Sequence, residues 1–466
     1  MFSELVLEVL SEEIPSRMHK CMISQVEAYF NKSFAKDSIS VSDMHIFINA
    51  RRLVVYLSDI KFTNLDSISF IKGPRVGSKQ NAIDGFLKKT GVSFDSLEVK
   101  TIKSEQFYCY VREVNASFLA QDILKNIIEG MFTHMSWPKS MRWGVNQFSW
   151  VRPILNILCL LDGKTFSISY ASFDSNNKTQ GNRFLSPEFF SVKNFEDYCK
   201  KISKQYVLLG YESRRDFVIS QITDLTEKKH LCCENNEKLL DEILGFVEYP
   251  MVILGRVDER FFGLPQPVIL TVMHHHQRYL AVRENGIIKN FIALTTLVSD
   301  DVIKGHEKVL RARLTDAQFL IDQDRRHDLD HYCAHLGNIV FHAKLGSLAD
   351  KVKRVVFLAK YLSVWVPQAS LIHVERAAQL CKADLSTAMV KEFPELQGVM
   401  GAYYAECLGE HSSVCGAISD HYMPVGANHD CPQSPVSIAI AIADKVDSMT
   451  GLIAIGEQPT SSGDPF

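Results

Sequence analysis

The chain has 466 residues, and at about 150 residues per domain this length predicts about three domains. Hydrophobic residues make up 46% of the chain and charged residues 23%, a balance typical of globular proteins that excludes a disordered or fibrous protein. The formal net charge is −3, so no global basic excess would hold nucleic acid, and any RNA contact would have to come from local basic patches.

The distribution of cysteines and apolar residues indicates a cytoplasmic protein. The 11 cysteines include no CxxC pair and no framework spacing, which favours a reducing compartment and argues against a zinc ribbon. The N-terminal segment carries four glutamates and lacks the basic and apolar regions of a signal peptide. The longest apolar stretches, 154–161 and 436–443, fall well short of the ~18 residues of a spanning helix, so we expect no membrane anchor.

The first two thirds of the chain combine strand and helix patterns. A buried strand at 5–10 is followed by a helix start at Ser11, with Pro15 in the first turn. Apolar runs predict further strands at 45–48, 53–60, 107–114, 154–161, 251–257, 268–273 and 291–297. Helical periodicity predicts helices at 82–90, 119–134, 213–229 and 235–246.

The pattern becomes helical from about residue 303. Apolar residues between Leu310 and Ile321 and between Phe341 and Leu362 repeat at helical spacing, and helices are also expected at 371–391, 396–409 and 433–454. The predicted fold class is therefore multidomain α+β, a mixed α/β N-terminal two thirds followed by an all-helical domain. The predicted domain ranges are 1–115, 116–302 and 303–466.

Two histidine-rich segments have alternative interpretations. His327, His331 and His335 recur every four residues on one helical face, which suits either a metal site or a solvated helix end. The run from His274 to Tyr279 follows a predicted strand end and mixes hydrogen-bond donors, a cation and an aromatic ring. That mixture suits contact with RNA or substrate, and a packed, hydrogen-bonded strand end is the alternative.

A further group of residues in the helical third resembles the metal site of HD-type phosphohydrolases. Asp384, His421 and Asp444 follow one another in the order in which such enzymes place ligands for a divalent ion that activates water. The position before Asp384 requires a histidine, but it holds Ala383, which has no lone pair to offer. We therefore predict an HD-like scaffold with degenerate positions, no metal and no hydrolase chemistry.

Several longer motifs, read together, resemble one family. They are NARRLVVYL (49–57), KGPR (72–75), MRWG (141–144), GNRFL (181–185), MHHHQRYL (273–280), KADLSTAMVKEFPELQGVMG (382–401), AIADKVDSMTGLIAIG (441–456) and PTSSGDPF (459–466). In this order and from end to end, the chain resembles the beta subunit of the bacterial-type heterotetrameric glycyl-tRNA synthetase.

The resemblance implies an assembly of two alpha and two beta subunits that joins glycine to tRNA(Gly). The alpha subunit would hold the adenylate site and use ATP and Mg, which fits the absence of P-loop, HIGH and KMSKS motifs from this sequence. This chain would bind and position tRNA(Gly), with no catalytic residue, cofactor, membrane or DNA partner of its own. Family members continue past residue 466 into an anticodon-binding domain, so we expect that domain to be absent and the chain to be C-terminally truncated.

Local basic clusters supply the candidate tRNA contacts, and range 116–302 is a candidate tRNA-contacting surface. The candidates are Arg51, Arg52, Arg75, Arg142, Arg152, Arg183, Arg278 and Arg311. Two other functions remain alternatives: an HD-like metal phosphohydrolase, which Ala383 argues against, and a non-catalytic RNA-binding or assembly protein.

Overall fold

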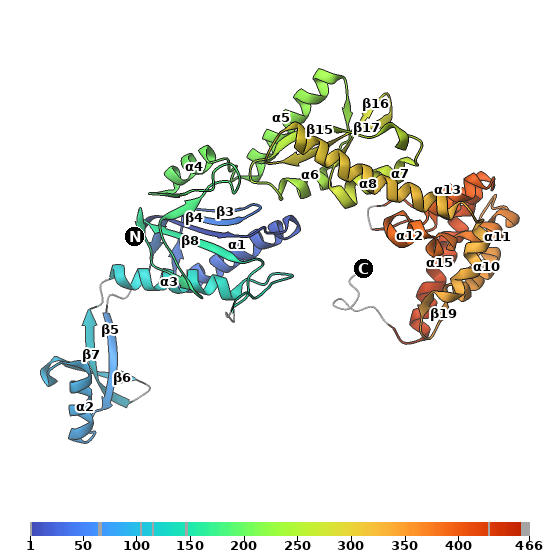
Figure 1. Ribbon diagram of the computed structural model, residues 1–466. Helices are drawn as coiled ribbons and strands as arrows, with labels where there is room; N and C mark the ends of the chain where they lie inside the picture. The colour runs from blue at the N-terminus through green and yellow to red at the C-terminus, as the bar shows by residue number, and fades with distance from the viewer. Residues whose placement is uncertain are drawn as a thin grey trace. The chain divides into compact units, whose positions relative to one another are not determined.

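The computed structural model describes residues 2–63, 68–102, 105–113, 116–144, 148–426 and 429–457 (Figure 1). The terminal motif at 459–466 lies outside the described residues. The chain forms two compact units, each made of several segments. The first contains Met1–Leu225, Glu237–Val252 and Leu294–Leu297, and the second contains Thr226–Asn236, Ile253–Ala293 and Val298–Phe466. The three ranges expected from the sequence remain a prediction.

The first unit is built on an antiparallel sheet whose central strand is β1 (Phe2–Ser11). β1 lies between β4 (Arg52–Phe62) and β8 (Ile154–Leu161), with β3 (Asp43–Ile48) on the far side of β4. Edge strands β2 (Ile39–Ser40) and β9 (Lys164–Thr165) complete it. These strands confirm the apolar runs expected at 5–10, 45–48, 53–60 and 154–161.

Alternate side chains of β1 enter two separate cores, as the period of a strand requires. Leu5 and Leu7 pack against α1 (His19–Lys36) and α3 (Ala116–His134), which cover one face of the sheet (Figure 1). Val6 packs on the opposite face against α4 (Phe195–Lys204). The neighbouring Glu8 is therefore a fully buried carboxylate on the α4 side. The helix expected from Ser11 starts later, because residues 16–18 form a 3-10 turn and α1 begins at His19.

A smaller three-stranded sheet, in the order β5-β7-β6, carries α2. Its strands are β5 (Ile68–Arg75), β6 (Leu97–Ile102) and β7 (Glu105–Glu113). Helix α2 (Gln80–Thr90) ends at Gly91, whose φ of 71° is the left-handed conformation expected of a helix stop.

Short strands and two helices complete the first unit. The strands are β10 (Ser169–Tyr170), β11 (Phe173–Asp174), β12 (Lys178–Gln180) and β13 (Phe189–Ser191). Helices α5 (Tyr211–Lys229) and α6 (Glu237–Leu244) confirm the helices predicted at 213–229 and 235–246, and the end of α5 enters the second unit.

A four-stranded sheet, in the order β14-β16-β17-β15, begins the second unit. Its strands are β14 (Cys232–Cys233), β15 (Met251–Arg256), β16 (Leu280–Glu284) and β17 (Ile287–Thr295). The strand predicted at 268–273 is wrong, because α7 (Gln266–Thr271) and a π-helical turn (Val272–Gln277) occupy this segment. Short apolar runs do not distinguish a buried helix from a strand, and Pro267 in the first turn of α7 favours a helix start.

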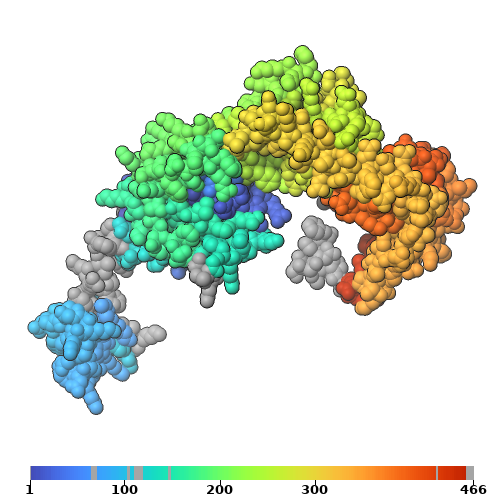
Figure 2. Space-filling model, in the orientation of Figure 1, coloured from blue at the N-terminus to red at the C-terminus, as the bar shows by residue number. Residues whose placement is uncertain are grey.

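The rest of the second unit is mainly helical and runs from yellow to red in Figure 2. Its helices are α8 (Asp300–Asp324), α9 (Leu329–His335), α10 (Leu348–Ser363), α11 (Leu371–Leu380), α12 (Ala388–Glu392), α13 (Val399–Cys407), α14 (Ser412–Asp420) and α15 (Pro435–Ala454). The description "all-helical" is wrong in detail, since β18 (Val340–His342) and β19 (Gly346–Ser347) form a hairpin. The structure does not establish an HD-like fold.

Two predicted helices have different bounds in the structure. The helix predicted from the apolar repeat between Phe341 and Leu362 begins only at Leu348, because Ser347 and Asp350 form a capping box there. The helix expected at 371–391 is divided into α11 and α12 by a 3-10 turn at Ala383–Ser386. Within the described residues, no helix is both long and apolar enough to cross a membrane.

Candidate functional site

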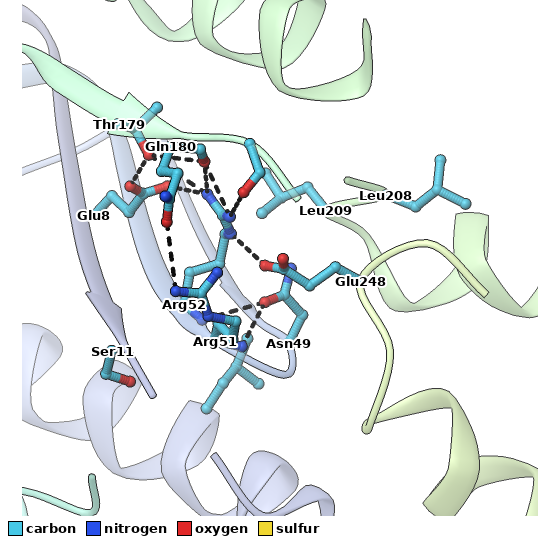
Figure 3. Close-up of polar contacts among 12 residues, drawn as sticks. Glu8, Ser11, Asn49, Arg51, Arg52, Thr179, Gln180, Leu208, Leu209 and Glu248 are labelled. Carbon is cyan, nitrogen blue, oxygen red and sulfur yellow. Dashed lines mark hydrogen bonds and ion pairs between the residues drawn. The ribbon is translucent and has the colours of Figure 1, made fainter. Parts of the chain in front are cut away.

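Arg52 lies at the centre of a buried ion-pair network in the first unit (Figure 3). Its Nε donates to Glu248 Oε1 at 2.7 Å, and its Nη1 donates to Glu8 Oε2 at 3.0 Å. Both Nη atoms also lie 3.1 Å from the carbonyl oxygen of Gln180. Burial alone would lower the pKa of Arg52, but the two carboxylates outweigh burial and raise that pKa.

Glu8 connects this network to the α4 side of the sheet. The hydroxyls of Tyr198 and Thr179 donate to its carboxylate in addition to Arg52. A buried charge is stable only when it is paired and hydrogen-bonded, and here both carboxylate oxygens have partners. Glu8 and Glu248 were not predicted from the sequence, although a lone carboxylate inside the apolar run LVLEVL is a signal that could have identified Glu8.

The neighbouring Arg51 is also buried, with 5% of its surface exposed, but its guanidinium is not saturated. Its Nη2 lies 3.4 Å from Gln180 Oε1, whereas Nε and Nη1 have no hydrogen-bond partner among the described residues. Asn49 is similar, because its Oδ1 accepts the amides of Arg51 and Arg52 while its Nδ2 has no partner within the described part of the chain. A buried donor without a hydrogen-bond acceptor destabilises the fold, and an oxyanion could accept hydrogen bonds from these donors.

Arg183 lies close enough to Arg51 to change the pKa of its guanidinium. Burial is the main cause that lowers the pKa of Arg51, and Arg183 lowers that pKa further. Arg183 itself pairs with Glu12 and with Glu13, the latter at 2.8 Å. Three of the eight predicted tRNA contacts, Arg51, Arg52 and Arg183, therefore meet at one place, which we call the arginine site.

The other five predicted arginines lie in other parts of the chain. Arg75 pairs with Glu105 in the three-stranded sheet, and Arg142 and Arg152 are exposed on either side of an isolated bridge between Met141 and Trp150. In the second unit, Arg278 donates to the carbonyl oxygens of His274 and His275. Arg311 lies 3.1 Å from Asp258. Their role in tRNA binding stays a prediction.

The run from His274 to Tyr279 does not follow a strand, so that part of the prediction is wrong. His274 pairs with Glu234, and the hydroxyl of Tyr279 lies 2.7 Å from His306 Nδ1. These two side chains have partners inside the fold, as the packed alternative requires. Contact between this segment and RNA stays a prediction.

Two of the HD-like positions, His421 and Asp444, contact buried lysine side chains in the second unit. Lys382 Nζ lies 2.8 Å from His421 Nε2 and 3.1 Å from Asp444 Oδ2, and all three residues are buried. Lys351 Nζ lies 3.0 Å from the other oxygen of Asp444 and 3.2 Å from Asp447. We call these five residues the lysine cluster. In it, ammonium groups supply the positive charge that a divalent ion supplies in a metal site.

Protonation in the lysine cluster follows from the geometry. Burial, followed by the nearby Lys382, lowers the pKa of His421 to about 3, so its imidazole is neutral. His421 Nδ1 lies 2.8 Å from the carbonyl oxygen of Ile418, which fixes the proton on Nδ1 and leaves Nε2 to accept from Lys382. This arrangement occupies the imidazole lone pair that a metal would need.

Asp384 and Ala383, the other two HD-like positions, are both fully buried in the fold. Asp384 Oδ2 accepts the amides of Gly398 and Gly401 near the start of α13, and burial raises the pKa of Asp384 to about 6. Ala383 is buried in the apolar core. Among the described residues, no group of three or more His, Cys, Asp or Glu side chains could hold a metal ion.

Comparison with known proteins gives one consistent result. Residues 5–466 match the family model described as glycyl-tRNA synthetase beta subunit. The chain is 36% identical over 471 residues to the glycine–tRNA ligase beta subunit of Rickettsia canadensis, covering 100% of this chain and 69% of that protein. It is also 36% identical over 474 residues to the subunit of the same name from Phenylobacterium zucineum, covering 99% of this chain and 70% of that protein. These matches show that the chain belongs to the glycyl-tRNA synthetase beta subunit family.

Proposed function

We propose that this chain binds tRNA(Gly) and positions it for ATP-dependent glycylation in the active site of a partner alpha subunit. The family match along residues 5–466 is the observation that carries the proposal, because members of this family are subunits of an aminoacyl-tRNA synthetase. A beta subunit implies a partner, and we propose a heterotetramer of two alpha and two beta subunits in the cytoplasm. ATP and Mg would be used by the alpha subunit.

The proposed contribution to catalysis is positional. The terminal ribose hydroxyl of the tRNA must reach the glycyl-adenylate, and holding two reactants in the right geometry removes several kcal/mol from a barrier without chemistry by the holder. Such a role requires RNA contacts and no reacting group. It agrees with the sequence, which has no recognisable ATP motif.

Among the predicted arginines, we propose Arg51 as the main RNA contact. Its Nε and Nη1 and the Nδ2 of Asn49 are donors without acceptors in the described residues, and a phosphate oxygen would satisfy them. Arg52 holds the same turn through Glu8 and Glu248, so its guanidinium is occupied and we assign it a positioning role. Arg183, with 35% of its side chain exposed, is the accessible edge of the arginine site.

The phosphohydrolase alternative is not favoured. Lys382 occupies His421 and Asp444, two of the three residues that would have to bind the metal. The non-catalytic assembly alternative differs from our proposal in a measurable way, because it requires no salt-dependent binding of tRNA.

Binding of tRNA(Gly) to the full chain, measured by filter binding over a series of salt concentrations, tests the proposal. Arg51→Lys keeps the charge but removes the guanidinium fork, and we expect it to weaken binding about tenfold. Arg215→Lys is the matched control, because Arg215 is a half-buried arginine of the same unit that pairs with Glu237 outside the arginine site. Equal affinities of the parent chain and Arg51→Lys would refute the role of Arg51, and salt-independent binding would refute the tRNA proposal.

A further inference from the structure

A cleft of about 670 Å³ in the second unit lies between the end of α8, α9 and α12. His327, His331 and His335 line it together with Arg326 and Lys391, and Phe319 of α8 adds an aromatic ring that is 62% exposed. We call it the histidine cleft. The three histidines are those whose spacing suggested either a metal site or a solvated helix end.

The geometry of the imidazoles does not suit a metal. The rings of His327 and His331 are stacked, with centroids 4.1 Å apart and planes 13° apart, and the rings of His331 and His335 are 4.6 Å apart. The nitrogen lone pairs of two stacked rings lie in nearly parallel planes, so they do not converge on one ion. His335 Nδ1 also lies 2.8 Å from the carbonyl oxygen of His331.

The lining of the histidine cleft carries two cationic side chains, Arg326 and Lys391, and one carboxylate, Asp324. Arg326 and Lys391 have no ion-pair partner among the described residues. The one acidic residue in the lining, Asp324, directs its carboxylate to the amides of Ala388 and Met389, both at 2.9 Å, and to the hydroxyl of Tyr404 at 3.0 Å. The cleft therefore offers cations and ring N–H donors without a carboxylate that competes for them.

The pKa of His331 is lowered from its ordinary value. Partial loss of hydration is the main cause, His327 and His335 lower the pKa further, and Asp328 opposes this effect. Asp328 accepts the amide of His331 at 2.8 Å as the N-cap of α9, and it does not line the cleft. An anion in the cleft would stabilise the protonated imidazole of His331, so binding should be accompanied by proton uptake.

From this arrangement we infer that the histidine cleft binds a nucleotide, holding its phosphate on Arg326, Lys391 and the imidazoles and stacking its base on Phe319. Arginine and lysine side chains are the usual partners of phosphate, and an exposed aromatic ring beside them is the usual platform for a base. The nucleotide is either a free mononucleotide or one residue of a single-stranded RNA. The inference does not depend on the proposed function, because a mononucleotide requires neither tRNA nor an alpha subunit.

Calorimetric titration of the full chain with inorganic phosphate, AMP and a single-stranded RNA hexamer tests this inference. We expect AMP to bind more tightly than phosphate, and Phe319→Ala to remove that difference while leaving phosphate binding unchanged. The double variant R326Q/K391Q should weaken all measurable binding at the cleft about tenfold or more. Lys353→Gln is the matched control, because this exposed lysine of α10 does not line the cleft.

The outcomes separate the two sources of the nucleotide. Tight binding of AMP that R326Q/K391Q weakens indicates a free nucleotide, and binding of the hexamer alone, with the same loss in the variant, indicates RNA. Affinity should rise as the pH falls from 8 to 6, and His331→Asn should reduce this rise. Unchanged affinities for all three probes in R326Q/K391Q, or no binding of any probe to the parent chain, would overturn the inference. Thermal unfolding of each variant distinguishes loss of binding from loss of fold.

Discussion

Lys382 Nζ lies 2.8 Å from His421 Nε2, so an ammonium group occupies the imidazole nitrogen that a metal would need at this position. The same ammonium lies 3.1 Å from Asp444 and 3.9 Å from the centre of the Tyr422 ring. The cluster thus supplies its own cation from the chain. This explains how buried residues that resemble metal ligands can be accommodated without a metal.

Replacing Lys382 with methionine should strongly destabilise the second unit. The methionine fills a similar volume, but it leaves Asp444 with one cation and His421 without a donor, and breaking a buried ion pair costs about 3–5 kcal/mol. Urea unfolding followed by circular dichroism measures the change. Lys353→Met, at an exposed position of α10, is the control and should leave the transition unchanged. Equal transitions for Lys382→Met and the parent chain would show that the lysine cluster does not stabilise the fold.

The lowered pKa of His421 predicts a loss of stability in acid. Its pKa is about 3 in the folded chain and about 6.5 in the unfolded chain, so between these values the unfolded state binds the extra proton. This group therefore contributes a loss of about 1.4 kcal/mol per pH unit as the pH falls below about 6. His421→Asn should lower stability at every pH but show a shallower dependence between pH 6 and pH 4. If the stability of His421→Asn and that of the parent chain change with pH in parallel, the imidazole of His421 is not buried in its neutral form.

Glu8→Gln tests the network around Arg52. The glutamine keeps the shape of the side chain but removes the charge that pairs with a fully buried guanidinium, and we expect a loss of about 3 kcal/mol. Glu196→Gln is the control, because Glu196 pairs with Lys200 on the surface of α4. An unfolding transition of Glu8→Gln that coincides with the transitions of the control and the parent chain would argue that Glu248 alone holds Arg52.

Two glycines of the helical part offer a matched pair of substitutions. A Cβ at Gly401 would lie 2.8 Å from Ile418 Cγ2 and 3.0 Å from Asp384 Oδ2, whereas a Cβ at Gly416 would meet nothing within 4 Å. We expect Gly401→Ala to destabilise the chain by about 1–3 kcal/mol through overpacking, and Gly416→Ala to stabilise it by up to about 1 kcal/mol through helix propensity. Thermal unfolding measures the change in stability of each variant. A change of the same sign in both variants would contradict the packing described for α13 and α14.

Local patterns predicted the strands and helices well where an element was long and its period clear. The run 154–161 is β8 with the same bounds, and the stop at Gly91 is the end of α2. The strand prediction at 268–273 was wrong because the apolar residues of this segment fit a buried helix as well as a strand. The predicted start of α10 was wrong because apolar spacing alone does not reveal a capping box at Ser347.

The two clusters of charge were harder to predict because their partners are distant in sequence. Arg52 meets Glu248, 196 residues away, and Lys382 meets His421 and Asp444, 39 and 62 residues away. The sequence identified Ala383 as the position where a ligand is missing, but it could not indicate that the preceding lysine enters the site. It identified Arg51 and Arg52 equally, and only the fold distinguishes a saturated guanidinium from one with free donors.

Glycine charging of tRNA(Gly) by the alpha subunit, measured with and without this chain, tests the proposed positioning role directly. We expect the alpha subunit alone to charge poorly and this chain to raise the charging rate, and we expect Arg51→Lys, but not Arg215→Lys, to lower the raised rate. If the alpha subunit charges tRNA(Gly) at the same rate in the presence and absence of this chain, the positioning role is wrong.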